Sequence, residues 1–123
     1  MRVGIIENEF ITRLSLTSIV KRLGFEVVGT GGNFDEAIKL TYDRHPDVLL
    51  LDSQLKGEKD GFDVAKALAG NSTRIIFVSN TSEKIAAEKL NDIPHYAILT
   101  KPIDNDLLVK QLLECAIELI IKT

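Results

Sequence analysis

The chain has 123 residues, of which 45% are hydrophobic, and these values fit a single globular domain over 1–123 rather than a disordered segment. It carries 15 basic and 18 acidic residues, a net charge of −3, without the basic cluster that marks direct binding of DNA or RNA. One cysteine, Cys115, excludes an internal disulfide and a cysteine-rich zinc site. Because no apolar run approaches the ~20 residues of a membrane span and no signal-peptide pattern opens the chain, we expect a soluble cytoplasmic protein without membrane contacts.

Short apolar segments alternate with helical patterns along the chain. The predicted strands are 3–6, 26–30, 48–51, 74–79 and 96–99, and the predicted helices are 10–23, 34–44, 62–69, 82–90 and 105–121. Two of the strands, 48–51 and 74–79, contain runs that are apolar at every position, which is typical of parallel strands covered on both faces. Since strand–helix–strand crossovers are right-handed, the pattern predicts an α/β fold, a doubly wound (βα)5 three-layer sandwich.

Several local signals predict structure rather than chemistry. Asn33 and Glu36 form a capping-box pattern at the start of the second helix. His45 and His95 precede strands, at the end of the sheet opposite the expected site, so we expect them at the surface as non-ligands. Cys115 lies within the last helical pattern and is predicted to be a small packing residue.

Polar side chains follow four of the predicted strands, at the edge of an open α/β sheet where ligands bind. A carboxylate there can attack phosphorus and form an aspartyl phosphate. A magnesium ion neutralises the incoming charge, and a lysine and a hydroxyl contact the phosphoryl oxygens. The residues that supply these groups are Glu7, Asn8 and Glu9 after the first strand, Asp52 after the third, Ser79 at the end of the fourth, and Lys101 after the fifth.

Each of these residues also has an ordinary structural explanation. Asp52 alone would be a turn-capping aspartate, Ser79 would merely end a strand, and Lys101 would be a surface residue. Glu9 is best explained as a helix-start acid, favoured by the positive end of the helix dipole. The functional interpretation therefore depends on these side chains meeting at one edge of the sheet.

Four segments match, in order, the motifs of a known family. They are Ile6–Glu9, Pro46–Asp52, Asp60–Phe62 and Leu99–Pro102. With these segments the chain resembles the receiver domain of two-component response regulators, of the CheY-like superfamily, over essentially its whole length. The resemblance implies a flavodoxin-like fold with a five-stranded parallel sheet of order 2-1-3-4-5.

The resemblance also implies roles in phosphoryl transfer. Asp52 is the phosphoacceptor, Ser79 is the switch hydroxyl that swings toward the phosphoryl group, and Lys101 is the phosphate-contacting lysine. The bond between Lys101 and the following proline is expected to be cis. The side chains of Gln54 and Thr81 occupy the positions that tune autodephosphorylation in this family.

A magnesium site is implied as well, with one departure from the family pattern. Glu7, Asn8, Asp52 and the backbone carbonyl of Gln54 would hold the ion. Asn8 stands where the family usually has an aspartate, so one of three nearby carboxylates is replaced by an amide. A charge step beside a dication is worth on the order of a few kcal/mol at an intermediate dielectric. We therefore expect weaker binding of Mg²⁺.

The second departure concerns the fifth strand. The family often has an aromatic residue three positions before the lysine, whose rotation reports phosphorylation, but this chain has Ile98 there. The nearest aromatic residue is Tyr96, which strand alternation places on the same side as Ile98. Tyr96 is thus a candidate substitute for the missing aromatic.

The last helix carries more apolar residues than one core-facing stripe needs. The excess predicts either a partner surface or a helix buried on two sides within a longer parent chain. In receivers, the face built from the fourth helix, the fifth strand and the fifth helix is a common surface for homodimers and signalling. The stripe consists of Leu108, Val109, Leu112, Leu113, Ala116, Leu119 and Ile120, and outside it lie Leu107, Ile117 and Ile121.

We expect a phosphorylation switch. A histidine kinase or phosphotransfer protein donates a phosphoryl group to Asp52, and the added charge biases an output surface that controls a downstream protein or output domain. Such a domain catalyses only its own modification and its autodephosphorylation, so it is not a turnover enzyme. The alternative, motivated by Asn8 and Ile98, is a degenerate receiver that serves as a phosphorylation-independent interaction module.

Two further classes share this topology, because fold alone does not fix function. A flavodoxin-type FMN protein would present backbone N–H groups after the first strand, whereas Glu7 and Glu9 would repel a phosphate there. A haloacid-dehalogenase-type phosphatase needs a second aspartate two positions after its nucleophile, where this chain has Gln54. Both classes are disfavoured.

Overall fold

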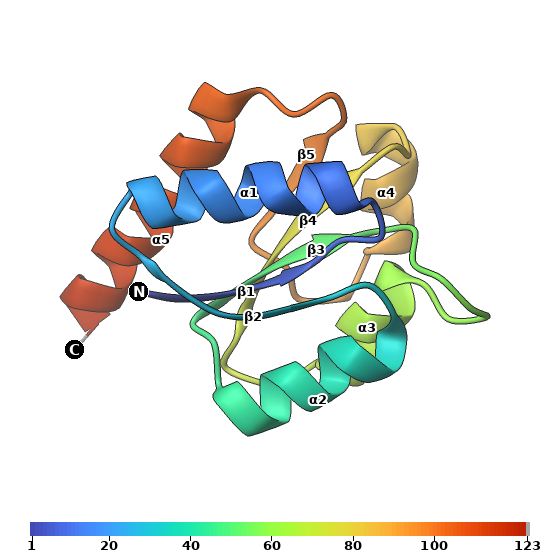
Figure 1. Cartoon of the computed structure of the whole chain (residues 1–123). Coiled ribbons are helices and arrows are strands. Elements are labelled where there is room, and N and C mark those ends of the chain that lie inside the picture. Colours follow the sequence, from blue (N-terminus) through green and yellow to red (C-terminus); the bar gives the residue numbers. More distant parts are fainter. Residues whose placement is uncertain (123) are drawn as a thin grey trace.

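The computed structural model describes residues 1–122; the last residue of the predicted domain, Thr123, lies outside the described residues. Five strands form one parallel sheet of order β2-β1-β3-β4-β5, which confirms the predicted fold (Figure 1). The elements are β1 (Arg2–Ile6), α1 (Phe10–Arg22), β2 (Glu26–Gly31), α2 (Phe34–Arg44), β3 (Val48–Asp52), α3 (Gly61–Ala67), β4 (Arg74–Ser79), α4 (Glu83–Lys89), β5 (Ala97–Thr100) and α5 (Asn105–Lys122).

Two apolar layers hold the sandwich together. The side chains of β3 alternate between them, since Leu49 and Leu51 pack under α2, α3 and α4 whereas Val48 and Leu50 pack under α1 and α5. All four are completely buried, and burial of each contributes about 2 kcal/mol to folding. The central strand thus forms a rigid support, and Asp52 at its end is held in a fixed place.

The helix caps differ in part from the prediction. The Asn33 side chain accepts a hydrogen bond from the Glu36 backbone N–H, as expected. The Glu36 carboxylate, however, accepts from the backbone N–H of Gly32 instead of that of Asn33. The capping box of α2 is therefore only half formed. A complete capping box opens α3, where Asp60 and Asp63 each accept from the other's backbone N–H.

The prediction that Tyr96 and Ile98 share a side is wrong. β5 begins at Ala97, which pairs with Ile76 of β4. Tyr96 therefore precedes the strand, and the alternation of strand side chains between the two faces of the sheet does not apply to it. Tyr96 packs with the layer under α1 and α5 and lies beside the Arg74 guanidinium, whereas Ile98 packs with the layer under α3 and α4. Tyr96 does not replace the aromatic residue expected at the position of Ile98.

The last helix, α5, buries a narrower stripe than predicted. Leu108, Leu112 and Cys115 are completely buried, which confirms the packing role of Cys115. Leu113 and Ile120, placed in the predicted stripe, are 43% and 75% exposed, because the i, i+4, i+7 spacing of the buried residues turns them away from the sheet. Over residues 1–122, none of the helices is both long enough and apolar enough to cross a bilayer.

Candidate functional site

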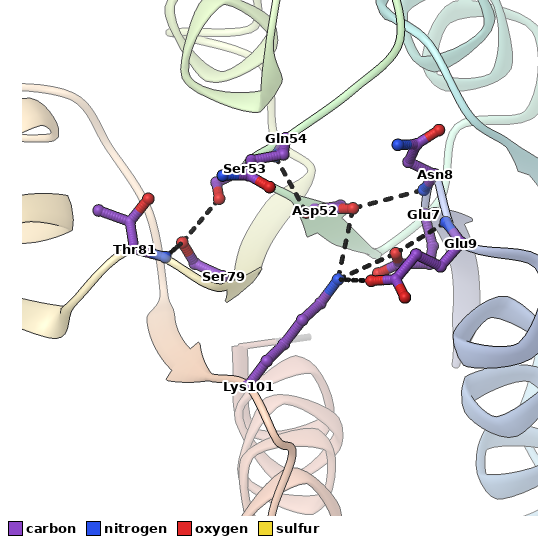
Figure 2. Close-up of polar contacts among 9 residues, drawn as sticks. All are labelled: Glu7, Asn8, Glu9, Asp52, Ser53, Gln54, Ser79, Thr81 and Lys101. Atoms are coloured by element: carbon purple, nitrogen blue, oxygen red, sulfur yellow. Dashed lines mark hydrogen bonds and ion pairs between the residues drawn. The ribbon is translucent and has the colours of Figure 1, made fainter.

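The carboxyl ends of β1, β3, β4 and β5 meet at one edge of the sheet, and the predicted site residues gather there (Figure 2). Lys101, directly after β5, places its Nζ atom 3.0 Å from Glu7 Oε1 and 3.5 Å from Asp52 Oδ2. The peptide bond between Lys101 and Pro102 is cis, as expected. A cation and two carboxylates from distant parts of the chain thus lie in one cluster.

Glu9 also belongs to this cluster, although its final interpretation from the sequence was a helix-start acid. It is the N-cap residue of α1, but its side chain makes no capping hydrogen bond. Instead its Oε1 atom accepts from Lys101 Nζ at 3.2 Å (Figure 2). Lys101 is therefore paired with three carboxylates, and the assignment of Glu9 to the helix dipole alone is corrected.

Asp52 is held by donors on several sides. Its Oδ1 atom accepts from the backbone N–H of Gln54 at 2.9 Å, and its Oδ2 atom accepts from the backbone N–H of Asn8 at 3.4 Å and from Lys101. The side chain of Asp52 is only 2% exposed. These donors orient the carboxylate, as a nucleophile requires.

A pair of hydroxyls lies beside Asp52 at the end of β4. Ser79 Oγ accepts from the backbone N–H of Thr81 at 3.0 Å and lies 2.6 Å from Ser53 Oγ (Figure 2). Ser79 and Thr81 were predicted as site residues, whereas Ser53 was not. Its signal was a second hydroxyl directly after the candidate phosphoacceptor.

The surface histidines fit their predicted positions. His45 is exposed at the C-terminal end of α2, in a left-handed conformation. His95 is exposed before β5, where its ring lies edge-on to Phe77. Neither residue contributes to the cluster around Asp52.

Comparison with known proteins decides the family. The family model of the response regulator receiver domain matches residues 3–113. The chain belongs to the response regulator receiver domain family. It is a receiver domain of a two-component response regulator.

Relatives of this receiver are known in sequence and in structure. It is 30% identical over 102 residues to the transcriptional regulatory protein PdtaR of Mycobacterium tuberculosis, covering 82% of this chain and 49% of that protein. It is 33% identical over 107 residues to the sensory transduction protein LytT of Bacillus subtilis, covering 86% of this chain and 44% of the relative. The chain spans about half or less of the length of these curated relatives. The receiver domain of the putative response regulator NarL from Mycobacterium tuberculosis superposes with a TM-score of 0.84 at 27% identity, covering 94% of both chains.

Burial and neighbouring charges shift the pKa values of Glu7 and Lys101 in the receiver site. Burial raises the pKa of Glu7 to about 7, and the neighbouring Asp52 carboxylate acts in the same direction. Burial lowers the pKa of Lys101, but the hydrogen bond to Glu7 and the negative charges of Asp52 and Glu7 outweigh it, so the pKa of this ammonium is raised. Lys101 therefore stays charged at neutral pH, whereas Glu7 titrates near it.

The raised pKa of Glu7 predicts a pH-dependent stability in the absence of divalent ions. The folded state holds the proton more tightly than the unfolded state, so Glu7 stabilises the fold below pH 4.5 and this contribution is lost as the pH rises to about 7. The loss is at most about 3 kcal/mol. Urea unfolding in EDTA between pH 4.5 and 8 measures it, with Glu7→Gln as the matched control. If the free energy of unfolding changed equally with pH in both proteins, the raised pKa of Glu7 would be contradicted.

The receiver has oxygen atoms that fit a hard cation. Within the described part of the chain, Glu7 Oε2 and Asn8 Oδ1 are buried without a hydrogen-bond partner, and Figure 2 shows the Asn8 side chain directed away from Asp52, which only the Asn8 backbone N–H contacts. Buried oxygens of this kind are normally satisfied, and carboxylate, amide and carbonyl oxygens are the ligands that Mg²⁺ takes. No group of three or more His, Cys, Asp or Glu side chains among residues 1–122 could hold a metal ion. The fit to Mg²⁺ therefore depends on the amide, the carbonyl and water as well as two carboxylates.

Proposed function

We propose that this receiver accepts a phosphoryl group on Asp52 from the phosphohistidine of a histidine kinase or phosphotransfer protein, with Mg²⁺ bound by Glu7, Asn8, Asp52 and the Gln54 carbonyl. The observation that carries the proposal is the position of Lys101 Nζ, 3.5 Å from the buried Asp52 carboxylate. This places a fixed cation where the transferred phosphoryl oxygens would accumulate negative charge.

The transfer needs a nucleophile, charge compensation and a leaving group. An Asp52 oxygen attacks phosphorus, the P–N bond of the phosphohistidine breaks, and the imidazole leaves with the electron pair and takes up a proton. Lys101 is released from part of its pairing with Glu7 and Asp52 and contacts the phosphoryl oxygens, while the Gln54 and Asn8 N–H groups orient Asp52. Magnesium, when bound, supplies further neutralisation of the phosphoryl charge.

A cleft beside Lys101 offers a donor protein a surface next to the site, although Asp52 itself does not line it. It has a volume of about 480 Å³ between α1 and the segment after β5, and Glu9, Asn80 and Lys101 line it. Ile11, which is 74% exposed, lies at its wall and offers apolar surface to a docking protein.

The phosphorylated domain acts as a switch rather than a turnover enzyme in this proposal. Ser79 turns toward the phosphoryl group, and the segment between β4 and α4 follows, which changes the α4-β5-α5 face. Ile85 on α4 and Leu107 on α5 are 48% and 42% exposed and give this face apolar surface for a downstream protein, an output domain or a second copy. Gln54 and Thr81, at the rim of the site, tune the hydrolysis of the aspartyl phosphate.

A phosphorylation-independent interaction module is the second candidate. It is favoured by Ile98 at the family's aromatic position and by the packing of Tyr96 on the opposite layer, because neither residue then supplies an aromatic side chain that could report the state of Ser79. It is also favoured by Asn8 in the acidic pocket, because an amide binds Mg²⁺ less strongly than a carboxylate.

Phosphorylation by a small-molecule donor distinguishes the two candidates. Incubation with acetyl phosphate or phosphoramidate and millimolar Mg²⁺ is expected to add the mass of one phosphoryl group to the intact protein. Asp52→Asn is expected to abolish the adduct, because the amide is not a nucleophile, whereas the matched change Asp35→Asn on the exposed surface of α2 leaves it. The absence of any adduct on the wild-type protein would favour the interaction module.

A further inference from the structure

We propose that Ser53, the residue after the candidate phosphoacceptor, is a positioning residue that holds the Ser79 hydroxyl away from Asp52 and so sets the free energy of switching. The inference rests on the proposed function, since it concerns how Ser79 responds to a phosphoryl group on Asp52. It starts from the distance of 2.6 Å between Ser53 Oγ and Ser79 Oγ.

The register of the central strands brings the two serines together. β3 and β4 are parallel with Asp52 paired to Val78, and the ladder continues with a hydrogen bond from the Ser53 N–H to the Val78 carbonyl. The next residues on the two strands, Ser53 and Ser79, therefore face each other. Both are buried, with exposed fractions of 1% and 0%.

The backbone of Ser53 is fixed by α3. Its carbonyl accepts from the Gly61 N–H at 3.0 Å, and a Cβ atom at Gly61 would lie 2.8 Å from the Ser53 Cα. Helix and strand are therefore packed directly against each other here. The Ser53 hydroxyl is held at its place opposite Ser79.

The hydroxyl of Ser79 has two hydrogen-bond partners in the unphosphorylated chain. It accepts from the Thr81 N–H and pairs with Ser53 Oγ, and the O···O distance of 2.6 Å is at the short end of the range for hydroxyl hydrogen bonds. In Figure 2 the Ser79 side chain points to Ser53 and Thr81, while the Asp52 carboxylate points to Lys101 and the residues after β1. Ser79 has to leave this pair before it contacts a phosphoryl group.

Leaving the pair has a cost that Ser53 determines. When Ser79 turns, the Ser53 hydroxyl stays buried with its partner lost, and a buried hydroxyl without a partner destabilises the state in which it occurs. With alanine at position 53 no such group exists. Ser53 therefore disfavours the switched conformation and stabilises, in the unphosphorylated receiver, the conformation in which Ser79 pairs with Ser53.

The test measures how tightly a phosphoryl analogue binds. Beryllium fluoride with Mg²⁺ is titrated into the wild-type protein and into Ser53→Ala, with the Thr81 amide followed by NMR. We expect the apparent affinity to rise about fivefold in Ser53→Ala, the range of one hydrogen bond. Ser53→Cys, which has a slightly larger side chain and a weakly hydrogen-bonding thiol, is expected to shift the affinity in the same direction. Ser18→Ala, on the exposed side of α1, is the control for a serine-to-alanine change.

A double-mutant cycle separates a hydrogen bond from a packing effect. In the Ser79→Ala background the change Ser53→Ala is expected to have no further effect, because the hydroxyl pair is already gone. An unchanged or weaker affinity in Ser53→Ala, or the same gain in the Ser79→Ala background, would overturn the role of Ser53. If the wild-type protein neither binds the analogue nor forms the Asp52 adduct, the proposed function itself fails and the inference fails with it.

Discussion

Replacing Gly61 by alanine is expected to destabilise the receiver by about 3 kcal/mol, at the upper end of the range for overpacking. A Cβ atom at this position would overlap the Asp52 carbonyl oxygen and lie 2.8 Å from the Ser53 Cα, and these are backbone atoms that cannot rotate away. Either α3 must retreat or the end of β3 must move, and the second response displaces the phosphoacceptor. Urea unfolding and the yield of the phosphoryl adduct measure the two effects.

Gly57→Ala is the matched control. Gly57 has a φ of 96°, which costs an alanine about 1–2 kcal/mol, but its Cβ would meet nothing within 4 Å. We expect this variant to lose less stability than Gly61→Ala and to keep its phosphorylation. If Gly61→Ala proved the more stable of the two, the close contact between α3 and the end of β3 would be wrong.

Replacing Asn8 by aspartate is expected to raise the affinity for Mg²⁺ on the order of 10- to 100-fold. The substitution adds a carboxylate where the buried Asn8 Oδ1 has no hydrogen-bond partner, on the residue whose backbone N–H contacts Asp52. In the absence of metal, the additional negative charge is expected to destabilise the fold by about 1–2 kcal/mol, since like charges in a buried site repel. Calorimetric titration with Mg²⁺ and unfolding with and without the ion measure both effects.

A second variant controls for the effect that one added negative charge has on Mg²⁺ binding from anywhere on the protein. Asn91→Asp makes the same substitution at an exposed position after α4. Its effect on Mg²⁺ binding is expected to be small, because exposed charges beyond about 10 Å are screened at ordinary ionic strength. Equal Mg²⁺ affinities in Asn8→Asp and Asn91→Asp would remove Asn8 from the metal site.

The strand order and the meeting of Asp52 with Lys101 could both be predicted, for related reasons. Buried parallel strands are apolar at every position, as in β3, and this pattern does not depend on neighbours in space. Once the sheet order follows from the receiver motifs, the carboxyl ends of β1, β3 and β5 must meet, and the side chains directly after them lie within reach of one another. Topology alone therefore brings Lys101 to Asp52.

Contacts that depend on how the strands align, or on where a strand begins and ends, could not be predicted. The pairing of Ser53 with Ser79 requires the alignment of β3 on β4, which nothing in a single sequence fixes. The contact of Glu9 with Lys101 depends on the path of the chain after β1, where strand alternation no longer determines side-chain direction. The side on which Tyr96 packs was predicted wrongly for the same reason, because the strand begins only where β4 offers a partner.

The position of Lys101 late in the chain has a consequence for biosynthesis. Lys101 lies 94 residues after Glu7 and 49 residues after Asp52, so a nascent chain that stops before β5 lacks the ammonium between their carboxylates. Two buried acids without a counter-charge resist close packing. The edge strand therefore completes the sheet and supplies the ammonium that offsets part of the negative charge at this edge, so a newly made molecule gains this counter-charge only after translation has passed Lys101.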